Sequence, residues 1–375
     1  MRFEIPFIRP VFPDSAVIAG DFEAIVESNW YTNFGPKERL FGAAVAERIG
    51  DGYRAVTFAN ATLGLIAAIQ STMGRGDATK YVIVPSFTFA AGAEAIEWAG
   101  YLPLLVDIDR GSLQPSLDGA TEALGNGAAD IAGILLCNTF GIGNREVDAW
   151  ERLAADAGIP IIIDSAAGFG STYADGAAVG TRGTAEVFSF HATKPFAIGE
   201  GGAVLTRDDD LAESLTSFQN FGFRSGKGAA GLGLNGKLQE VNAAIGLRQL
   251  ETFDAALASR RSVLAEYMSA LDDLPITFPD AVQDSSVCFA SMVFESGSAR
   301  DDAFQRLTEN GVEVRTYYNP AVHRQPYFEN SRRIGALPVT DDTVGSILSV
   351  PVHQDMDPGA VQRIVAAIRD SRLAE

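Results

Sequence analysis

The feature that most constrains the fold is an alternation of short apolar runs with amphipathic helical patterns between Arg54 and Thr206. Continuous apolar runs are typical of strands that are buried on both faces. Helices between successive strands return the chain to the same end of the sheet, so the strands run parallel. We expect strands at 81–85, 102–108, 131–137, 160–164, 186–190 and 202–206, and helices at 62–70, 90–99, 117–124 and 147–157. The pattern predicts an α/β fold with a mostly parallel central sheet flanked by helices, which binds its ligand beyond the carboxyl ends of the strands.

The pattern changes after Asp208, where helices dominate. We expect helices at 211–219 and 240–271, strands at 274–279 and 287–294, and a final helix at 359–369. A chain of 375 residues exceeds the size at which a single core stops growing, roughly 250–300 residues. The sequence therefore predicts an N-terminal arm and helix (1–50) that need not belong to the sheet, a large α/β domain (51–245), and a smaller C-terminal α+β domain (246–375). The boundary is expected inside the long helix that links them.

Composition and charge restrict the possible partners. The net charge is −19, from 29 basic and 48 acidic residues, which argues against nucleic acid or an anionic membrane as a partner. Cys137 and Cys288 lie far apart and neither has a metal-ligand spacing, so no metal site is expected. The N-terminus lacks a signal-peptide apolar region, and no apolar run approaches the ~18 residues of a membrane span. These features predict a reduced, cytoplasmic protein.

Lys194 is the residue that is hardest to explain structurally. The apolar, β-rich segment 187–190 precedes it, Pro195 follows it, and a glycine cluster at 199–202 leads into the next apolar run. Because the residue before a proline is pushed away from helical dihedrals, we expect Lys194 on a non-helical turn between two buried strands. A lysine held there is a candidate nucleophile or Schiff-base amine. The ordinary alternative is a loop lysine whose ammonium reaches water.

A candidate anion site lies where a strand meets a helix near Ala61 and Thr62. The free backbone N–H groups of a helix start, together with the Thr62 hydroxyl, can bind a phosphate. The alternative is that Asn60 or Thr62 only caps the helix. Ser189, five residues before Lys194, is a natural second phosphate contact.

Asp164 ends the apolar run 161–163 and so lies at the carboxyl end of an expected strand. A carboxylate there can hold a pyridinium nitrogen in its protonated form, as pyridoxal 5'-phosphate requires to act as an electron sink. The alternative is a cap for the following turn. Taken together, the phosphate site, the aspartate and Ser189 with Lys194 form one constellation that fits pyridoxal phosphate.

Nearly the whole chain resembles the DegT/DnrJ/EryC1/StrS family of pyridoxal-phosphate-dependent sugar aminotransferases, which have the aspartate aminotransferase-like fold type I. The segments that carry the resemblance are 29–36 (NWYTNFGP), 84–89 (VPSFTF), 100–103 (GYLP), 106–109 (VDID), 188–194 (FSFHATK), 200–202 (EGG), 234–237 (LNGK), 239–246, 317–320 (YYNP), 323–327 (HRQPY) and 349–353 (SVPVH). Their combination is highly specific to this family.

The resemblance implies catalytic and cofactor-binding roles for named residues. It makes Lys194 the Schiff-base lysine and proton shuttle, and it pairs Asp164 with the pyridine nitrogen. Phe89 would stack on the cofactor ring. The residues that would hold the phosphate are Ala61, Thr62 and Ser189, joined by Asn235 from the neighbouring subunit of a homodimer.

Other positions are implied in substrate binding or depart from the family pattern. The resemblance places the segment with Tyr31 and Thr32, together with Tyr318 and His323, near the substrate. His191 and His353 are expected to be structural. The departures from residues that are common in the family are Ala61, Asn138, Ala167, Phe221 and Lys237. Of these, Ala167 removes a usual contact near the phenolic oxygen of the cofactor.

The resemblance implies an aminotransferase that moves an amino group from L-glutamate to a nucleotide-linked keto-sugar, an NDP-4-keto-6-deoxyhexose in deoxysugar, antibiotic or surface-glycan biosynthesis. One alternative acceptor is an aminocyclitol-type ring ketone, and another alternative is a non-catalytic regulatory relative. Sugar dehydratases of this fold replace the lysine with histidine, so Lys194 argues against that activity. A cysteine desulfurase-like lyase is disfavoured because neither cysteine lies on a candidate mobile loop.

Overall fold

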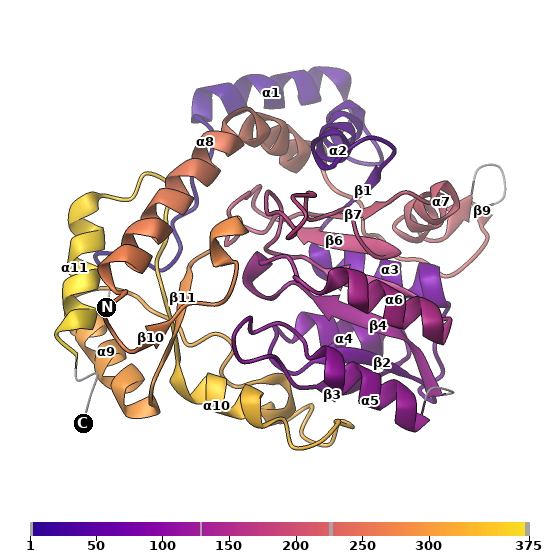
Figure 1. The fold of residues 1–375 in the computed structure, drawn as a ribbon. Helices are drawn as coiled ribbons and strands as arrows, with labels where there is room; N and C mark the ends of the chain where they lie inside the picture. Colours follow the sequence, from indigo (N-terminus) through magenta and orange to yellow (C-terminus); the bar gives the residue numbers. More distant parts are fainter. Residues whose placement is uncertain (1–2, 128–129, 225–227, 372–375) are drawn as a thin grey trace.

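A seven-stranded sheet forms the centre of the computed structural model, which describes residues 3–127, 130–224 and 228–371 (Figure 1). The strands are β1 (Arg54–Phe58), β2 (Tyr81–Pro85), β3 (Leu102–Val106), β4 (Ile131–Cys137), β5 (Ile161–Asp164), β6 (Ala185–Ser189) and β7 (Gly202–Thr206). They lie in the order β1-β7-β6-β5-β4-β2-β3. β7 is antiparallel to β1 and β6, and the other neighbouring strands are parallel. The expected mostly parallel sheet is confirmed.

Helices cover both faces of this sheet, as the apolar strands predicted. One face packs against α3 (Ala61–Met73), α4 (Ala91–Trp98) and α7 (Asp209–Phe218). The other face packs against α2 (Pro36–Ile49), α5 (Leu117–Gly127), α6 (Val147–Ala157) and α8 (Glu240–Ala270). The sheet therefore has two separate apolar layers, which explains why its strands carry few polar residues.

A second, three-stranded antiparallel sheet lies beyond α8, in the order β10-β11-β12 (Figure 1). Its strands are β10 (Ile276–Thr277), β11 (Ala290–Phe294) and β12 (Ile347–Val350). The helices of this part of the chain are α9 (Gly297–Glu309), α10 (Pro338–Ser346) and α11 (Pro358–Arg369). The remaining short elements are β8 (Phe223–Arg224), β9 (Gly228–Ala229) and the 3₁₀ helices η2 (Thr139–Gly141), η3 (Val282–Asp284) and η4 (Val322–Arg324). The long helix α8 contributes its first half to the core of the large sheet and its second half to the core around the small sheet.

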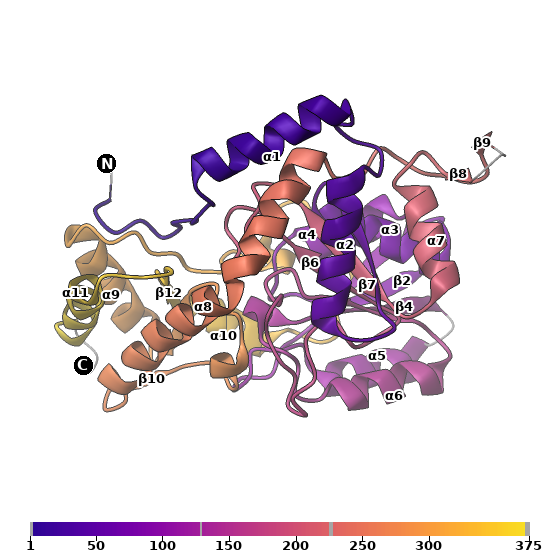
Figure 2. The ribbon, with the colours of Figure 1, turned by 90° about the horizontal axis from the view of Figure 1, so that it is seen from above.

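The N-terminal 50 residues divide between these cores. Ile5 and Phe7 are buried with the small sheet, and Ile5 forms a β-bridge with Val312. α2 contributes to the core of the large sheet. α1 (Ser15–Ser28) lies across α2 and α8 (Figure 2), where Asp21 accepts hydrogen bonds from Lys37 Nζ at 2.7 Å and Arg248 Nε at 2.8 Å.

The expected strands and helices of the large sheet agree with the structure to within a few residues at their ends. The small unit differs more from expectation. The strand expected at 274–279 is only Ile276–Thr277, and the one expected at 287–294 begins at Ala290 because Val287 adopts a positive φ of 54°. α9, α10 and β12 were not expected as elements. Among the described residues, no helix has the length and apolar character needed to cross a membrane.

Candidate active site

The carboxyl ends of three neighbouring strands bring candidate site residues together. Asp164 at the end of β5 is the register partner of Cys137 at the end of β4 and of Val187 on β6. β6 continues for two more residues to Ser189, which faces Gly202 at the start of β7. Because parallel strands end at the same edge, these positions meet where α/β sheets usually bind ligands.

Asp164 is almost fully enclosed, with 9% of its surface exposed. Its Oδ1 accepts a hydrogen bond from Ala166 N at 3.0 Å. Burial raises the pKa of Asp164, and the Ala166 N–H and the positive charge of Lys194 oppose that rise. A buried carboxylate of this kind gains from a cationic partner, because a second charge offsets the cost of desolvation.

Lys194 lies in the non-helical turn between β6 and β7, as predicted from Pro195. Its backbone N–H donates to His191 O at 2.9 Å, and Ala192 N bonds across the loop to Gly199 O at 2.9 Å. The side chain is half-buried and lines a narrow cleft with the N-terminal segment and α8. Burial raises the pKa values of Asp164, Cys137 and Cys288, and the positive charge of Lys194 opposes that rise. The neighbouring Thr193 O accepts a hydrogen bond from Cys288 Sγ at 3.3 Å.

The start of α3 has free backbone amides at the position of the predicted anion site. Asn60 caps the helix by accepting Leu63 N at 3.0 Å, and the N–H groups of Ala61 and Thr62 have no acceptor among the described residues. A Cβ atom on Gly202 would lie 2.8 Å from Ala61 N. Glycine at this position therefore lets the helix start approach β7, beside the strand end that carries Ser189. Asn60 therefore caps the helix, as the alternative interpretation held, while the Ala61 and Thr62 amides stay available for an anion.

Two aromatic side chains differ sharply in exposure at this edge. Phe89, which follows β2, is 65% exposed and stacks on no aromatic ring among the described residues. Tyr318 stacks on Phe140 with ring centroids 5.3 Å apart, and burial raises the pKa of its phenol well above the ordinary value. Asp164 is among the groups that act on this phenol, which places Tyr318 beside the site.

Tyr31 and Thr32 lie away from Lys194 of the same chain. Tyr31 O accepts the N–H of Glu240 at the start of α8. The Lys194 cleft contacts α8 from Gln249 onward, about two and a half turns or roughly 13 Å further along the helix. Neither Tyr31 nor Thr32 lines the cleft that contains Lys194 of the same chain.

Asn235 is exposed on the loop that precedes α8. Its Oδ1 accepts a hydrogen bond from Lys237 Nζ at 2.7 Å, and Lys237 lies over the Phe221 ring at 4.8 Å. Gly236 O accepts Ala59 N at 2.7 Å, so this loop lies beside the start of α3. Lys237 and Phe221, two departures from the family pattern, thus contact each other.

His323 is enclosed rather than open to a ligand. It is 3% exposed, its Nδ1 lies 2.6 Å from Ser86 Oγ, and its Nε2 lies 3.0 Å from Asp341 Oδ1. Burial lowers the pKa of His323. Both ring nitrogens are occupied, so the expected contact between this ring and a substrate has no support in the geometry, and we do not retain it.

A buried polar cluster behind the edge was missed by the sequence analysis. Glu186 on β6 is fully buried and accepts hydrogen bonds from Tyr173 OH at 2.8 Å, from Asn138 Nδ2 at 3.2 Å and from Ser165 Oγ. Burial raises the pKa of Glu186 to about 7, against the effect of these donors. The one feature of the sequence that could have indicated this cluster is the glutamate within the otherwise largely apolar strand β6.

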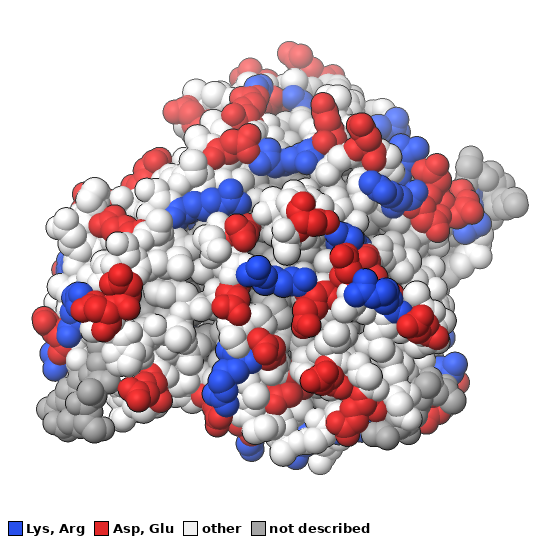
Figure 3. Space-filling view, in the orientation of Figure 1, with Lys and Arg blue, Asp and Glu red and all other residues white. Residues whose placement is uncertain are grey.

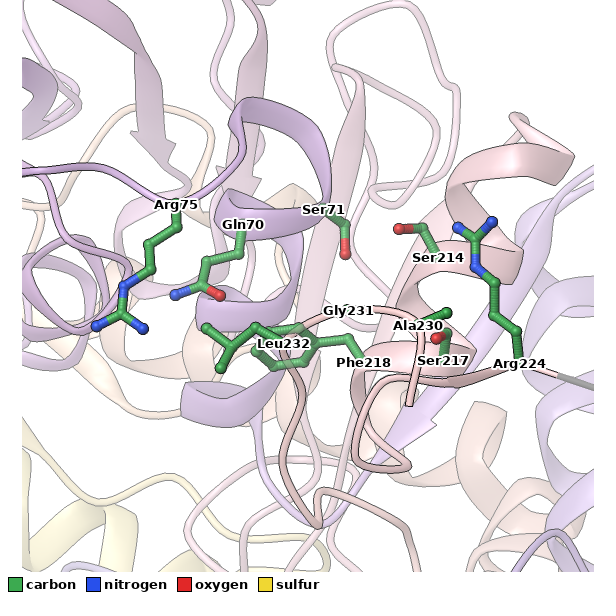
Figure 4. A pocket seen from close by; sticks show the side chains of 10 residues that line it. All are labelled: Gln70, Ser71, Arg75, Ser214, Ser217, Phe218, Arg224, Ala230, Gly231 and Leu232. Atoms are coloured by element: carbon green, nitrogen blue, oxygen red, sulfur yellow. The ribbon is translucent and has the colours of Figure 1, made fainter. Parts of the chain in front are cut away.

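Among the described residues, neither the surface charges nor the cavity between α3 and α7 indicates a second candidate active site. Acidic and basic side chains are interspersed on the face in Figure 3. A cavity of about 220 Å³ between α3, α7 and the segment 230–232 has Arg75 and Arg224 on opposite sides (Figure 4), and none of the predicted site residues lines it. No cluster of side chains suited to a metal ion occurs among residues 3–127, 130–224 and 228–371.

The sequence matches a family model and is similar to known proteins over nearly its full length. The model of the DegT/DnrJ/EryC1/StrS aminotransferase family matches residues 14–369. Protein Rv3402c of Mycobacterium tuberculosis is 47% identical over 373 residues, which cover 99% of this chain and 90% of that protein. The dTDP-4-amino-4,6-dideoxy-D-glucose transaminase of Shigella dysenteriae is 28% identical over 367 residues, covering 96% and 97% of the two chains.

The fold also matches solved structures. The crystal structure of DesI in the presence of its TDP-sugar product superposes with a TM-score of 0.89 at 30% identity, covering 98% of this chain and 93% of that one. Agreement over both the large sheet and the smaller unit shows the fold type I arrangement.

Proposed function

The chain belongs to the DegT/DnrJ/EryC1/StrS aminotransferase family, whose members depend on pyridoxal phosphate, and from this premise we propose that it transfers an amino group from L-glutamate to an NDP-4-keto-6-deoxyhexose. The observation that carries the proposal is the placement of Lys194 and the buried Asp164 at one strand edge. A lysine amine and an enclosed carboxylate are the two groups that this cofactor needs from the protein.

The residues at the edge fit pyridoxal phosphate. The free Ala61 and Thr62 amides and the Ser189 hydroxyl suit a phosphate. Asp164 gains a cationic partner if it meets a protonated ring nitrogen. Phe89 offers an open ring face for stacking. Bound at this edge, the cofactor supplies the electron sink that lets an amino group leave one carbon and enter another.

The residues at this edge have different roles in the proposed reaction. Lys194 would hold the cofactor covalently through its amine, and the free amine would accept and return the proton of the amino donor. Asp164 would keep the ring nitrogen protonated. The α3 start and Ser189 would hold the phosphate and so fix the position of the cofactor relative to Lys194.

The names of two similar proteins support this acceptor class. The Shigella dysenteriae protein is named for a dTDP-linked 4-amino-4,6-dideoxy sugar, and DesI was crystallised with a TDP-sugar product. A nucleotide-linked 4-keto-6-deoxyhexose is the acceptor that would give such an amine by transamination.

We also propose that two copies of the chain complete each site. Asn235 is exposed, and the exposed Phe221, Phe223 and Leu232 lie on the same segment. The segment with Tyr31 and Thr32 does not line the cleft of its own Lys194, so in this arrangement it serves the partner's site together with the Asn235 amide.

The acceptor can be tested with purified holoenzyme and L-glutamate. We expect dTDP-4-keto-6-deoxyglucose to yield 2-oxoglutarate and an amino sugar, detected by mass spectrometry, while an inosose ring ketone yields neither. Reaction with the inosose alone would replace the sugar by an aminocyclitol acceptor. Cofactor binding without reaction of any ketone would favour a regulatory relative.

The phosphate site can be tested through the affinity for the cofactor. We expect Ser189→Ala to raise the dissociation constant for pyridoxal phosphate about tenfold, because a hydrogen bond to a charged group contributes roughly 1.5–3 kcal/mol. The measurement is quenching of protein fluorescence as the cofactor is added to apoenzyme. Ser291→Ala, which alters a buried serine on β11 bonded to Ser349, is the matched control and should leave the constant unchanged. Equal effects of the two variants would contradict the assignment of Ser189.

A further inference from the structure

The buried carboxylate of Glu186 lies directly behind the cofactor edge. Glu186 is on β6, three residues before Ser189, and its Cα partner on β5 is Ile163, the residue before Asp164. Its neighbours on the same face of β6 belong to an apolar core that contains Phe188 and Phe190. An apolar side chain would satisfy that core, so the carboxylate needs another explanation.

Five donors surround this carboxylate. Ser165, Tyr173 and Asn138 donate to Oε1, and the N–H groups of Gly180 and Arg182 donate to Oε2 at 2.6 and 3.2 Å. Because the full lone-pair capacity is used, the group is held in one orientation.

No described lysine or arginine side chain forms an ion pair with Glu186. Arg182 donates its backbone N–H to Glu186, but its guanidinium pairs with Asp148 at 2.9 Å and with Asp175 and Glu151. The phenol of Tyr173 and that of Tyr53 are the titratable groups that face Glu186. The negative charge is therefore stabilised by oriented dipoles rather than by a counter-ion.

Two of the donors are the residues that follow the strand ends of the site. Ser165 follows Asp164, and Asn138 follows Cys137. Asn138 Nδ2 also donates to Ser165 Oγ at 2.8 Å, and Asn138 N donates to Asp164 O at 2.9 Å. The Glu186 carboxylate on β6 thus joins the residues that follow the ends of β4 and β5.

We propose that Glu186 is a positioning residue that holds the Asp164 carboxylate against the ring nitrogen of pyridoxal phosphate through Ser165 and Asn138. The inference rests on the proposed role of Asp164. Asn138, which stands where the family commonly has histidine, acquires a specific role here: its amide donates to both Ser165 and Glu186.

The test uses Glu186→Gln, which keeps the shape but turns an NH₂ group toward N–H and O–H donors. The matched control is Glu38→Gln. Glu38 is another buried glutamate; it lies on α2 and accepts a hydrogen bond from Thr57 of β1. The readouts are the dissociation constant of pyridoxal phosphate and the pH midpoint of the bound cofactor's visible absorption band. The second readout responds to the partner of the ring nitrogen and not to stability as such.

We expect Glu186→Gln to weaken cofactor binding about tenfold, the size typical of removing a group that orients a direct ligand, and to shift the pH midpoint. Tyr173→Phe removes one donor with little change in shape and should weaken binding about threefold in the same direction. If Glu186→Gln does not fold, the result for Tyr173→Phe tests the inference in its place. Glu38→Gln should change neither readout.

The two possible failures can be told apart with Asp164→Asn. If Asp164→Asn shifts both readouts while Glu186→Gln and Tyr173→Phe behave like Glu38→Gln, the inference about Glu186 is wrong and Asp164 keeps its role. If Asp164→Asn changes neither readout, the proposed role of Asp164 is wrong, and the inference about Glu186, which rests on it, is wrong as well.

Discussion

Lys194→Ala is expected to lower turnover by at least about 10⁴-fold, because the variant lacks both the covalent link to the cofactor and the base that moves the proton. Lys194 is at the strand edge, where its charge acts on Asp164, and no other described lysine acts on that carboxylate. The measurement is 2-oxoglutarate formation under saturating substrates, together with the visible absorption of the holoenzyme.

Two variants sharpen this prediction. Lys194→Arg keeps the positive charge beside Asp164 but cannot form the covalent link, so it should be as inactive as the alanine variant. Lys80→Ala, at an exposed lysine before β2, should retain full activity. Appreciable turnover by Lys194→Arg would show that the lysine acts only through its charge and would contradict the proposed mechanism.

We expect the second-largest effect from Asp164→Asn, which should lower turnover by roughly three orders of magnitude. Loss of one partner from a buried ion pair costs roughly 3–5 kcal/mol, and here that partner keeps the ring nitrogen protonated. The side chain is enclosed, so water cannot replace the lost carboxylate. Single-turnover kinetics of the donor half-reaction, followed by absorbance, measure this step directly.

Asp107→Asn is the matched control for this variant. Asp107 directly follows β3 and accepts hydrogen bonds from Val339 N at 3.0 Å and Thr340 N at 2.8 Å, so it caps α10 rather than facing the lysine. The control should lose stability by about 1 kcal/mol and keep its turnover. If both variants lost turnover equally, Asp164 would be a structural cap, which is the alternative that the sequence left open.

The large sheet could be predicted because its physical signals are local. β4 is apolar throughout and β5 is apolar up to Asp164 at its end, since helices cover both of their faces. The turn at Lys194 followed from the restriction that Pro195 places on the residue before it. The small unit gave weaker signals. α9 buries only a narrow stripe of Ala299, Ala303 and Leu307 amid charged residues, so its helical period is hard to see.

The site was only partly predictable, because several roles depend on which segments meet. His323 lies in a family-like segment, yet Ser86 and Asp341 from distant segments occupy its ring nitrogens. Tyr31 also lies in such a segment, yet it contacts the start of α8, roughly 13 Å along the helix from the part that lines the Lys194 cleft. Neither outcome has a local cause, so neither could be derived from the residues nearby in sequence.

The sequence by itself determined the α/β sheet, the turn that carries Lys194 and the position of Asp164 at a strand end, because periodicity and proline stereochemistry act over a few residues. Only the tertiary structure decided which groups surround them. Four of the five donors around Glu186 come from the long connection between β5 and β6, and the fifth, Asn138, follows β4; the carboxylate is stable in the core only when all of them converge. That convergence depends on strand register and loop packing, which no local pattern encodes.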